Sequence, residues 1–156
     1  MIGVDWGTSR FRAYRMAADG TVVSRREADL GVAVLQPADF PDVLRREAGD
    51  WIKQDDGPVV LAGMVGSRQG WVEAPYLPCP ANAGRIAANA IPVDLPWGGR
   101  AWIVPGLLAR DGQGRADVLR GEETQLIGLM FSLGDKAADI CLPGTHSKWA
   151  DIAGGA

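Results

Sequence analysis

The run from Val59 to Val65 constrains the fold more than any other stretch, because nearly all of its residues are apolar. A strand that is apolar on both faces has to be covered on both faces, which is typical of a parallel strand inside a sheet. Gly57-Pro58 directly precedes the run and marks its beginning. The run therefore predicts an α/β fold in which helices cover a sheet.

The N-terminal residues predict antiparallel strands for the same sheet. Residues 2–6 alternate, residues 11–16 form a second strand-like run, and Asp19-Gly20 is a strong turn signal before a third run at 21–26. We therefore expect a three-strand meander that joins the parallel strands in one mixed sheet.

Helical periodicity follows the meander. Apolar residues recur at helical spacing between Phe40 and Ile52, which predicts a helix from about Asp39 to Gln54. Asn82 is expected to cap a short helix that extends to Ile91 and is stopped by Pro92. Residues 92–99 and 111–115 are expected to be loops, with a short strand at 101–104.

Composition excludes several classes of protein. The 156 residues carry a net charge of −3 with no basic run, which argues against general binding to nucleic acid. The sequence contains neither an apolar run long enough to span a bilayer nor a secretion signal, so we expect a cytoplasmic protein without membrane contact. Cys79 and Cys141 lack metal-ligand spacing. The composition is compatible with a homo-oligomer.

The turn after the first strand has the residues of a phosphate site. Gly7 lets the backbone approach an anion, Thr8 and Ser9 add donors, and Asp5 can hold a hydrated Mg²⁺ ion. The alternative is a hairpin whose Asp5 merely ends a strand.

A polar loop follows the buried strand, at the edge of the sheet where α/β proteins usually bind ligands. Arg68 suits a carboxylate because its planar fork can donate two parallel hydrogen bonds. The alternative is a loop held by a surface Arg–Glu pair with its aromatic residues packed inward. The candidate substrate-binding residues of this loop are Ser67, Arg68, Gln69, Trp71, Glu73 and Tyr76.

Three blocks of the sequence, Gly63–Tyr76, Arg120–Gln125 and Leu142–Trp149, together resemble the 2-dehydro-3-deoxygalactonokinase family. The opening Asp5-x-Gly-Thr-x-x-x-Arg likewise resembles the first phosphate loop of the sugar kinase, hsp70 and actin superfamily. The resemblance implies a ribonuclease-H-like lobe, the first of two. It also implies a kinase that uses ATP and Mg²⁺ to phosphorylate the primary hydroxyl of a 2-keto-3-deoxy sugar acid.

The resemblance also implies a division of the chain. Residues 1–135 would form the sugar-binding lobe and residues 136–156 the truncated start of a nucleotide-binding lobe. The chain is about half as long as such kinases, so we expect weak or no turnover from it alone. We also expect a tail that is either poorly ordered or recruited by a neighbouring molecule.

Residues 121 and 122 open a predicted helix whose apolar stripe runs from Leu126 to Leu133. In related sugar kinases a Gly-acid pair at such a helix start supplies the catalytic base, so the resemblance assigns that role to Glu122. Glu123 is the competitor. The alternative is that both acids simply favour a helix start electrostatically.

The final block resembles a degenerate copy of the opening hairpin, with Leu142 in the position of Asp5. In relatives this second turn holds phosphate, so the resemblance offers further phosphate-binding candidates. The single histidine could instead be a structural hydrogen-bond partner. The candidates are Gly144, Thr145, His146, Ser147 and Lys148.

Two other functions compete with the kinase. A non-catalytic sugar-acid or nucleotide-binding lobe of the same fold would bind without turnover. A metal-dependent nuclease would need several converging carboxylates and a basic path, and the acidic balance of the chain provides no such path.

Overall fold

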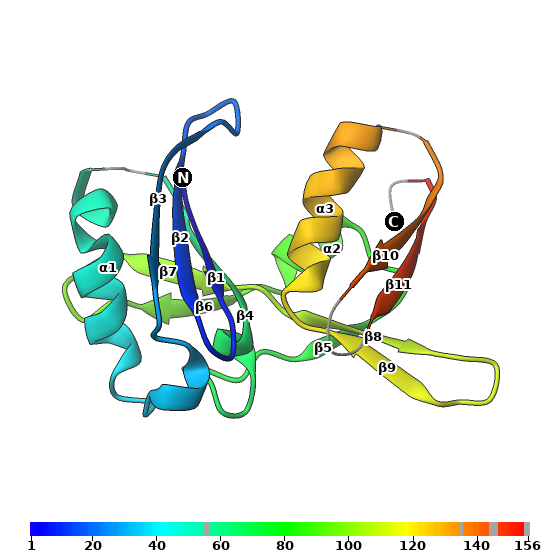
Figure 1. The fold of residues 1–156 in the computed structure, drawn as a ribbon, viewed down its shortest axis with the longest axis horizontal. Helices are drawn as coiled ribbons and strands as arrows, with labels where there is room; N and C mark the ends of the chain where they lie inside the picture. The colour runs from blue at the N-terminus through cyan, green and yellow to red at the C-terminus, as the bar shows by residue number, and fades with distance from the viewer. Residues whose placement is uncertain (55–56, 135, 144–146, 155–156) are drawn as a thin grey trace.

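The computed structural model describes residues 1–54, 57–134, 136–143 and 147–154. Figure 1 shows a large sheet with one long helix on each side and a smaller group of strands beside the second helix. The strands are β1 (Ile2–Trp6), β2 (Phe11–Met16), β3 (Val22–Ala28), β4 (Val59–Gly63), β5 (Tyr76–Pro78), β6 (Ile91–Asp94), β7 (Arg100–Ile103), β8 (Gly106–Arg110), β9 (Ala116–Leu119), β10 (Ala138–Leu142) and β11 (Lys148–Ile152). The α-helices are α1 (Phe40–Gln54), α2 (Ala83–Ala88) and α3 (Glu122–Leu133).

The large sheet is mixed and has the strand order β3-β2-β1-β4-β7-β6. β1 pairs with β2 antiparallel and with β4 parallel, and β4 pairs with β7 parallel. This arrangement confirms the predicted antiparallel meander joined to parallel strands. Because β1 and β4 are parallel and Trp6 lies opposite Gly63, their carboxyl ends meet at one edge of the sheet.

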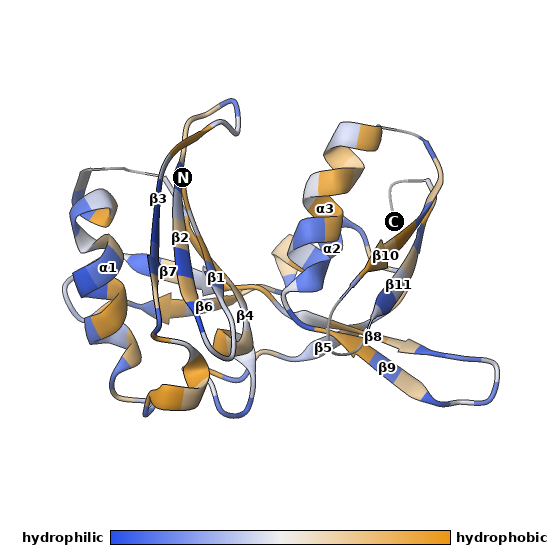
Figure 2. Cartoon of the chain, in the orientation of Figure 1, coloured by the Kyte–Doolittle hydropathy of each residue, from blue (hydrophilic) through white to orange (hydrophobic). Residues whose placement is uncertain are grey.

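The main core lies between the large sheet and α1. Trp6 and Phe11 meet edge to face with ring centroids 4.8 Å apart, and Phe40 of α1 tilts against Trp6 at 5.0 Å. All three side chains are fully buried. Figure 2 shows both hydrophobic and hydrophilic residues along α1, and hydrophilic residues over most of the edge strand β3. The spacing of the apolar residues therefore selects the buried face of α1, as predicted.

The opposite face of the sheet meets α2, α3 and a second sheet with the strand order β5-β8-β9. A smaller core forms there around Ala62, Ile86 and Leu107, with Ile127 of α3 packed against it. Asn82 caps α2 as predicted, because its Oδ1 accepts a hydrogen bond from the Arg85 N–H at 2.9 Å. This second layer places the start of α3 close to the carboxyl ends of β1 and β4.

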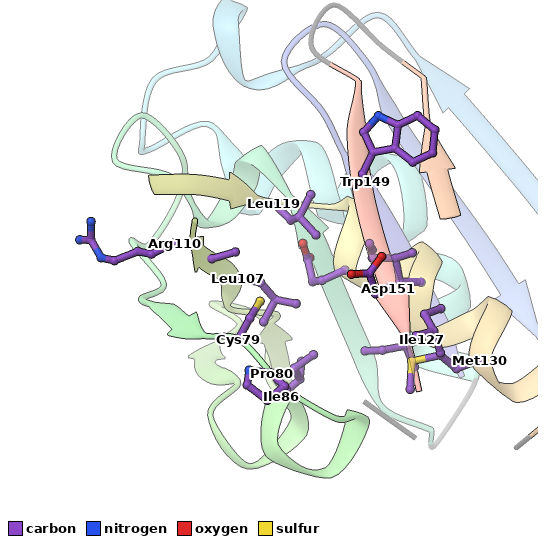
Figure 3. A pocket seen from close by; sticks show the side chains of 16 residues that line it. Cys79, Pro80, Ile86, Leu107, Arg110, Leu119, Ile127, Met130, Trp149 and Asp151 are labelled. Atoms are coloured by element: carbon purple, nitrogen blue, oxygen red, sulfur yellow. The ribbon is translucent and has the colours of Figure 1, made fainter. Parts of the chain in front are cut away.

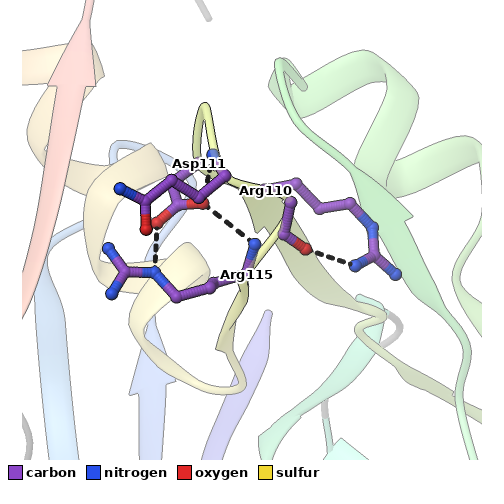
Figure 4. Close-up of polar contacts among 5 residues, drawn as sticks. Arg110, Asp111 and Arg115 are labelled. Atoms are coloured by element: carbon purple, nitrogen blue, oxygen red, sulfur yellow. Dashed lines mark hydrogen bonds and ion pairs between the residues drawn. The ribbon is translucent and has the colours of Figure 1, made fainter.

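The predicted end of the short helix was wrong. The short helix ends at Ala88, and Ile91 and Pro92 belong to β6, which is an edge strand where the missing N–H of a proline is tolerated. Residues 111–115 form the predicted loop, which connects β8 and β9 through a tight turn. Asp111 Oδ1 accepts the backbone N–H groups of Gln113 and Arg115, both at 2.9 Å. Figure 4 shows the contacts between Asp111 and Arg115.

The C-terminal segment contributes two strands to the structure. β10 and β11 pair antiparallel, and Ile152 at the end of β11 is 5% exposed. Burial of this side chain gives the hairpin an anchor. Among the described residues, the helices are too short and too polar to cross a membrane.

Candidate functional site

A polar hollow of about 260 Å³ lies beside the carboxyl end of β1. Asp5 comes from β1, Glu122 from the first turn of α3 and Leu142 from the end of β10. Residues separated by more than a hundred positions in the chain therefore share one small space. The hollow is lined by Asp5, Arg120, Gly121, Glu122, Gln125, Leu142 and Pro143.

Asp5 is oriented by the neighbouring strand of the hairpin. Asp5 lies opposite Arg12 in the β1–β2 register, and Arg12 Nη1 donates a hydrogen bond to Asp5 Oδ2 at 2.9 Å. This bond raises the pKa of Arg12, against the smaller opposing effect of burial. Arg10 lies outside the strand, near Glu27 and Asp29. Of Arg10 and Arg12, Arg12 is therefore the one that contacts Asp5.

Two glycines allow the start of α3 to approach the sheet. Gly121 has a φ of 112°, and a Cβ there would lie 3.2 Å from the Cα of Gly63. Gly63 itself has a φ of 95°, and its own Cβ would lie 2.9 Å from the Trp6 carbonyl oxygen. Glycine is favoured in such conformations because it has no side chain to clash. The two glycines therefore bring Glu122 to the edge of the sheet that carries Asp5.

The two acids at the start of α3 point to different places. Glu122 Oε2 accepts the Arg120 backbone N–H at 2.9 Å, and Glu122 lines the polar hollow. Glu123 is 1% exposed and accepts the Gly121 N–H at 2.7 Å. Burial raises the pKa of Glu123 to about 7, and the nearby charge of Glu122 adds to the rise. Both acids thus bind backbone N–H groups before the helix, as the electrostatic alternative expects, but only Glu122 lines the polar hollow.

An apolar hollow of about 430 Å³ lies on the other side of Glu123. In Figure 3, Ile127 and Met130 of α3 face Leu107 of the small sheet, with Trp149 and Asp151 of the C-terminal hairpin nearby. Glu123 contributes to the lining of this hollow. An apolar surrounding favours the neutral form of a carboxyl group, which agrees with the raised pKa.

The loop after β4 holds the predicted substrate-binding residues. Arg68, Gln69 and Glu73 are exposed, and Ser67 Oγ accepts the Gln69 N–H at 3.3 Å. Trp71 is half-buried and stacks on Phe40 with ring centroids 6.3 Å apart, so it packs toward the core as the alternative expects. The loop therefore offers one exposed arginine and several hydroxyl-binding groups.

Tyr76 belongs to a cluster that the sequence did not reveal. The Arg120 guanidinium lies over the Tyr76 ring, 4.1 Å from its centroid, and Arg120 Nε donates a hydrogen bond to the Tyr76 hydroxyl at 3.1 Å. Arg120 Nη2 also donates to the Ala74 carbonyl oxygen at 2.8 Å. Arg120 directly precedes Gly121 and Glu122, and this position was the one signal in the sequence that could have pointed to a role for Arg120 at the site.

The predicted phosphate turn at residues 7–9 follows Asp5 closely in the sequence, but these residues do not line the polar hollow. The Gly7 N–H donates to the Arg10 carbonyl within the turn, and the Gly7 and Thr8 carbonyls accept N–H groups from residues 32 and 33. The side chains of Thr8 and Ser9 belong to exposed residues. These two hydroxyls, more than the Gly7 N–H, are free to meet an anion.

The second predicted phosphate turn is described only in part. Gly144, Thr145 and His146 lie outside the described residues. Ser147 is exposed, and the Lys148 ammonium group donates to the Asp117 carboxylate. In this structure Lys148 therefore ties β11 to β9 and does not line the polar hollow.

The donor set of the hollow fits magnesium only in combination with a substrate. Within the described ranges, no three His, Cys, Asp or Glu side chains are grouped to hold a metal ion. Mg²⁺ commonly binds one or two carboxylates and completes its coordination with water and substrate phosphates. Asp5 with Glu122 nearby matches that pattern.

Comparison with known proteins identifies the family. The family model described as 2-keto-3-deoxy-galactonokinase matches residues 5–156. The chain belongs to the 2-keto-3-deoxy-galactonokinase family. This result confirms the resemblance seen in the three sequence blocks.

Two individual relatives support the assignment to the 2-keto-3-deoxy-galactonokinase family. A protein of Rhizobium meliloti (strain 1021), assigned as 2-dehydro-3-deoxygalactonokinase DgoK1, is 41% identical over 152 residues, which are 96% of this chain and 48% of that protein. The 2-dehydro-3-deoxygalactonokinase of Escherichia coli (strain K12) is 39% identical over 148 residues, covering 95% of this chain and 48% of that enzyme.

A solved structure shows the same fold. The crystal structure of a protein from Sinorhizobium meliloti, assigned as a 2-dehydro-3-deoxygalactonokinase, superposes with a TM-score of 0.80 at 38% identity. The match covers 97% of this chain and 49% of the other. The chain thus spans about half the length of the relatives that it matches.

Proposed function

We propose that this chain provides the sugar-acid site and the catalytic base of an ATP-dependent kinase that phosphorylates 2-dehydro-3-deoxygalactonate on its primary hydroxyl. The observation that carries the proposal is the polar hollow, in which Asp5 and Glu122 meet at the carboxyl ends of β1 and β4. Family membership supports the choice of reaction, since the relatives are named for it. Residues 1–135 would form the sugar-binding lobe, with residues 136–156 as the start of a nucleotide-binding lobe. We expect the reaction to take place in the cytoplasm.

The substrate would lie between the loop after β4 and the start of α3. Arg68 is exposed and its guanidinium can bind the carboxylate of the sugar acid in a bidentate manner. Gln69, Glu73 and the exposed edge of Tyr76 would bind hydroxyl groups or the C–H face of the sugar chain. The primary hydroxyl at the other end would then reach the polar hollow.

Glu122 would accept the proton of that hydroxyl. Its Oε2 is held by the Arg120 N–H, while the described residues offer its Oε1 no hydrogen bond. A fixed carboxylate with one open oxygen is suited to general-base catalysis when the hydroxyl comes within hydrogen-bond distance. Glu123 is less suited, because it is buried beside the apolar hollow.

Phosphoryl transfer depends mainly on positioning and on neutralising charge. Asp5, oriented by Arg12, would hold Mg²⁺, and the ion would neutralise the charge of the ATP phosphates. Thr8 and Ser9 would donate hydroxyl groups to the phosphates. Ser147, Lys148 and the turn at 144–146 would add phosphate contacts if Lys148 leaves Asp117.

Calorimetric titration of the chain with 2-dehydro-3-deoxygalactonate tests the sugar-acid site. We expect saturable binding that is lost in Arg68→Ala and retained in Arg100→Ala, a control arginine that pairs with Asp94 on the far strands of the large sheet. Galactose, which lacks the carboxylate, should bind much more weakly. A folded wild-type chain that binds the acid no better than galactose would contradict the proposal.

A further inference from the structure

Arg120 lies between the small sheet and α3, and its side chain reaches back to the substrate loop. The residue follows β9 and directly precedes Gly121. Its guanidinium holds the Ala74 carbonyl through Nη2 and the Tyr76 hydroxyl through Nε, and it stacks on the Tyr76 ring. These three contacts fix the end of the loop that begins at Gly66.

The third nitrogen of the guanidinium points into the protein. Arg120 Nη1 is buried, and the described residues provide no hydrogen-bond partner for it. It lies against Gly66, where a Cβ would be 3.0 Å from Nη1 and 2.8 Å from Ile103 Cγ2. Because the guanidinium is rigid and planar, fixing Nε and Nη2 also fixes Nη1. A buried donor without a partner is unfavourable, so the other contacts must hold the group in this orientation.

The backbone of the same residue holds the candidate base. The Arg120 N–H donates to Glu122 Oε2 at 2.9 Å, and both residues line the polar hollow with Asp5. One residue therefore contacts the substrate loop through its side chain and Glu122 through its main chain. Gly66 completes the arrangement, since any larger residue there would displace the guanidinium or Ile103.

We propose that Arg120 is a positioning residue that sets the substrate loop at a fixed distance from Glu122. This inference rests on the proposed function. It differs from a direct role in binding, because the buried Nη1 is closed to a substrate, while Nε and Nη2 already donate hydrogen bonds to the Tyr76 hydroxyl and the Ala74 carbonyl oxygen. With the loop fixed, the carboxylate end of the sugar acid and its primary hydroxyl reach Arg68 and Glu122 together.

Arg120→Lys and Tyr76→Phe test this role. Lysine keeps the charge but cannot form the planar fork, and phenylalanine keeps the ring while removing the hydroxyl. We expect the dissociation constant of 2-dehydro-3-deoxygalactonate to rise about tenfold in Arg120→Lys, equivalent to about 1.4 kcal/mol, and less in Tyr76→Phe. Arg100→Lys is the matched control and should bind like the wild type, because the Arg100 side chain is paired with the exposed Asp94 at 2.8 Å, on strands β6 and β7 of the large sheet.

Amide hydrogen exchange gives a second, binding-independent measurement. The Trp71 and Ala74 N–H groups bond within the loop to the Val65 and Gly66 carbonyls, while the Val104 N–H bonds to Leu61 in the large sheet. We expect Arg120→Lys to accelerate exchange in the loop by about tenfold and to leave Val104 unchanged. The Arg120 Nε–H resonance should shift in Tyr76→Phe because its acceptor is gone.

The outcomes separate the inference from the proposed function. If the wild type binds no sugar acid, the proposed function fails, and loop exchange alone decides whether Arg120 fixes the loop. If loop and sheet amides accelerate equally, Arg120 is a general structural residue and the inference is wrong. Unchanged affinity in a folded Arg120→Lys protein would also overturn it.

Discussion

Replacing Glu123 by Gln should remove a fall in stability that we expect of the wild type between about pH 4.5 and pH 7. Glu123 is 1% exposed, and burial raises its pKa from 4.5 to about 7. Since the pKa in the folded protein lies above that in the unfolded chain, the folded protein binds the proton more tightly. The free energy of unfolding therefore falls as the pH rises through this window, and the penalty is complete above it.

The size of the effect follows from the pKa difference. A gap from 4.5 to about 7 corresponds to about 3 kcal/mol at about 1.4 kcal/mol per pKa unit. Glutamine cannot ionise and can still accept the Gly121 N–H through its carbonyl oxygen. Its amide group adds a donor beside the apolar hollow, which costs about 1 kcal/mol. Glu123→Gln should thus be about 2 kcal/mol more stable than the wild type at pH 8 and about 1 kcal/mol less stable at pH 4.

Urea unfolding at pH 4, 6 and 8 measures these differences, and comparing variant with wild type at each pH cancels the titration of the other groups. Glu122→Gln is the matched control, because it retains the buried Glu123 and should retain most of the fall in stability, which burial causes, while losing the smaller contribution of the Glu122 charge. Parallel pH profiles for Glu123→Gln and the wild type would refute the reasoning. They would show that the Glu123 carboxylate is solvated or paired in the folded protein.

Two further predictions concern stability. Arg26 binds both carboxylate oxygens of Asp50, at 2.6 and 2.8 Å, and this contact holds the pKa of Asp50 at about 2. Arg26→Lys should therefore lower the free energy of unfolding at pH 7 by about 1 kcal/mol. The loss should be smaller at pH 2, where Asp50 is half protonated. Gly121→Ala should destabilise the protein by about 2 kcal/mol, because Gly121 has a positive φ and lies close to Gly63. Gly128→Ala, in the open interior of α3, should stabilise the protein by about 1 kcal/mol. Thermal unfolding of the two variants distinguishes backbone strain from a general response to alanine.

Strong local patterns predicted the elements that position the site. The apolar run at 59–65 became a strand with parallel neighbours on both sides, and the spacing from Phe40 to Ile52 became α1. Burial of β4 and of one face of α1 requires these patterns of apolar residues, so both can be recognised in the sequence. The Gly121-Glu122 pair likewise opens α3 as predicted.

Features that depend on distant partners were not predictable from the sequence. Pro92 reads as a stop signal, yet it fits β6 because an edge strand leaves one side of its backbone unpaired. Arg120 meets Ala74 and Tyr76 across more than forty residues, and no local pattern encodes such a contact. The proposal of Glu122 rather than Glu123 as the base also rests on the two hollows, one polar and one apolar, that lie on either side of the start of α3.

The most direct test of the account is a crystal structure of this chain with 2-dehydro-3-deoxygalactonate bound. The distance to measure is that between the primary hydroxyl oxygen of the sugar acid and the Glu122 carboxylate. We predict a hydrogen-bond distance of about 2.6 to 3.2 Å, with the substrate carboxylate on Arg68. A sugar acid bound with that hydroxyl against Glu123, or bound in the apolar hollow away from Asp5, would contradict the account.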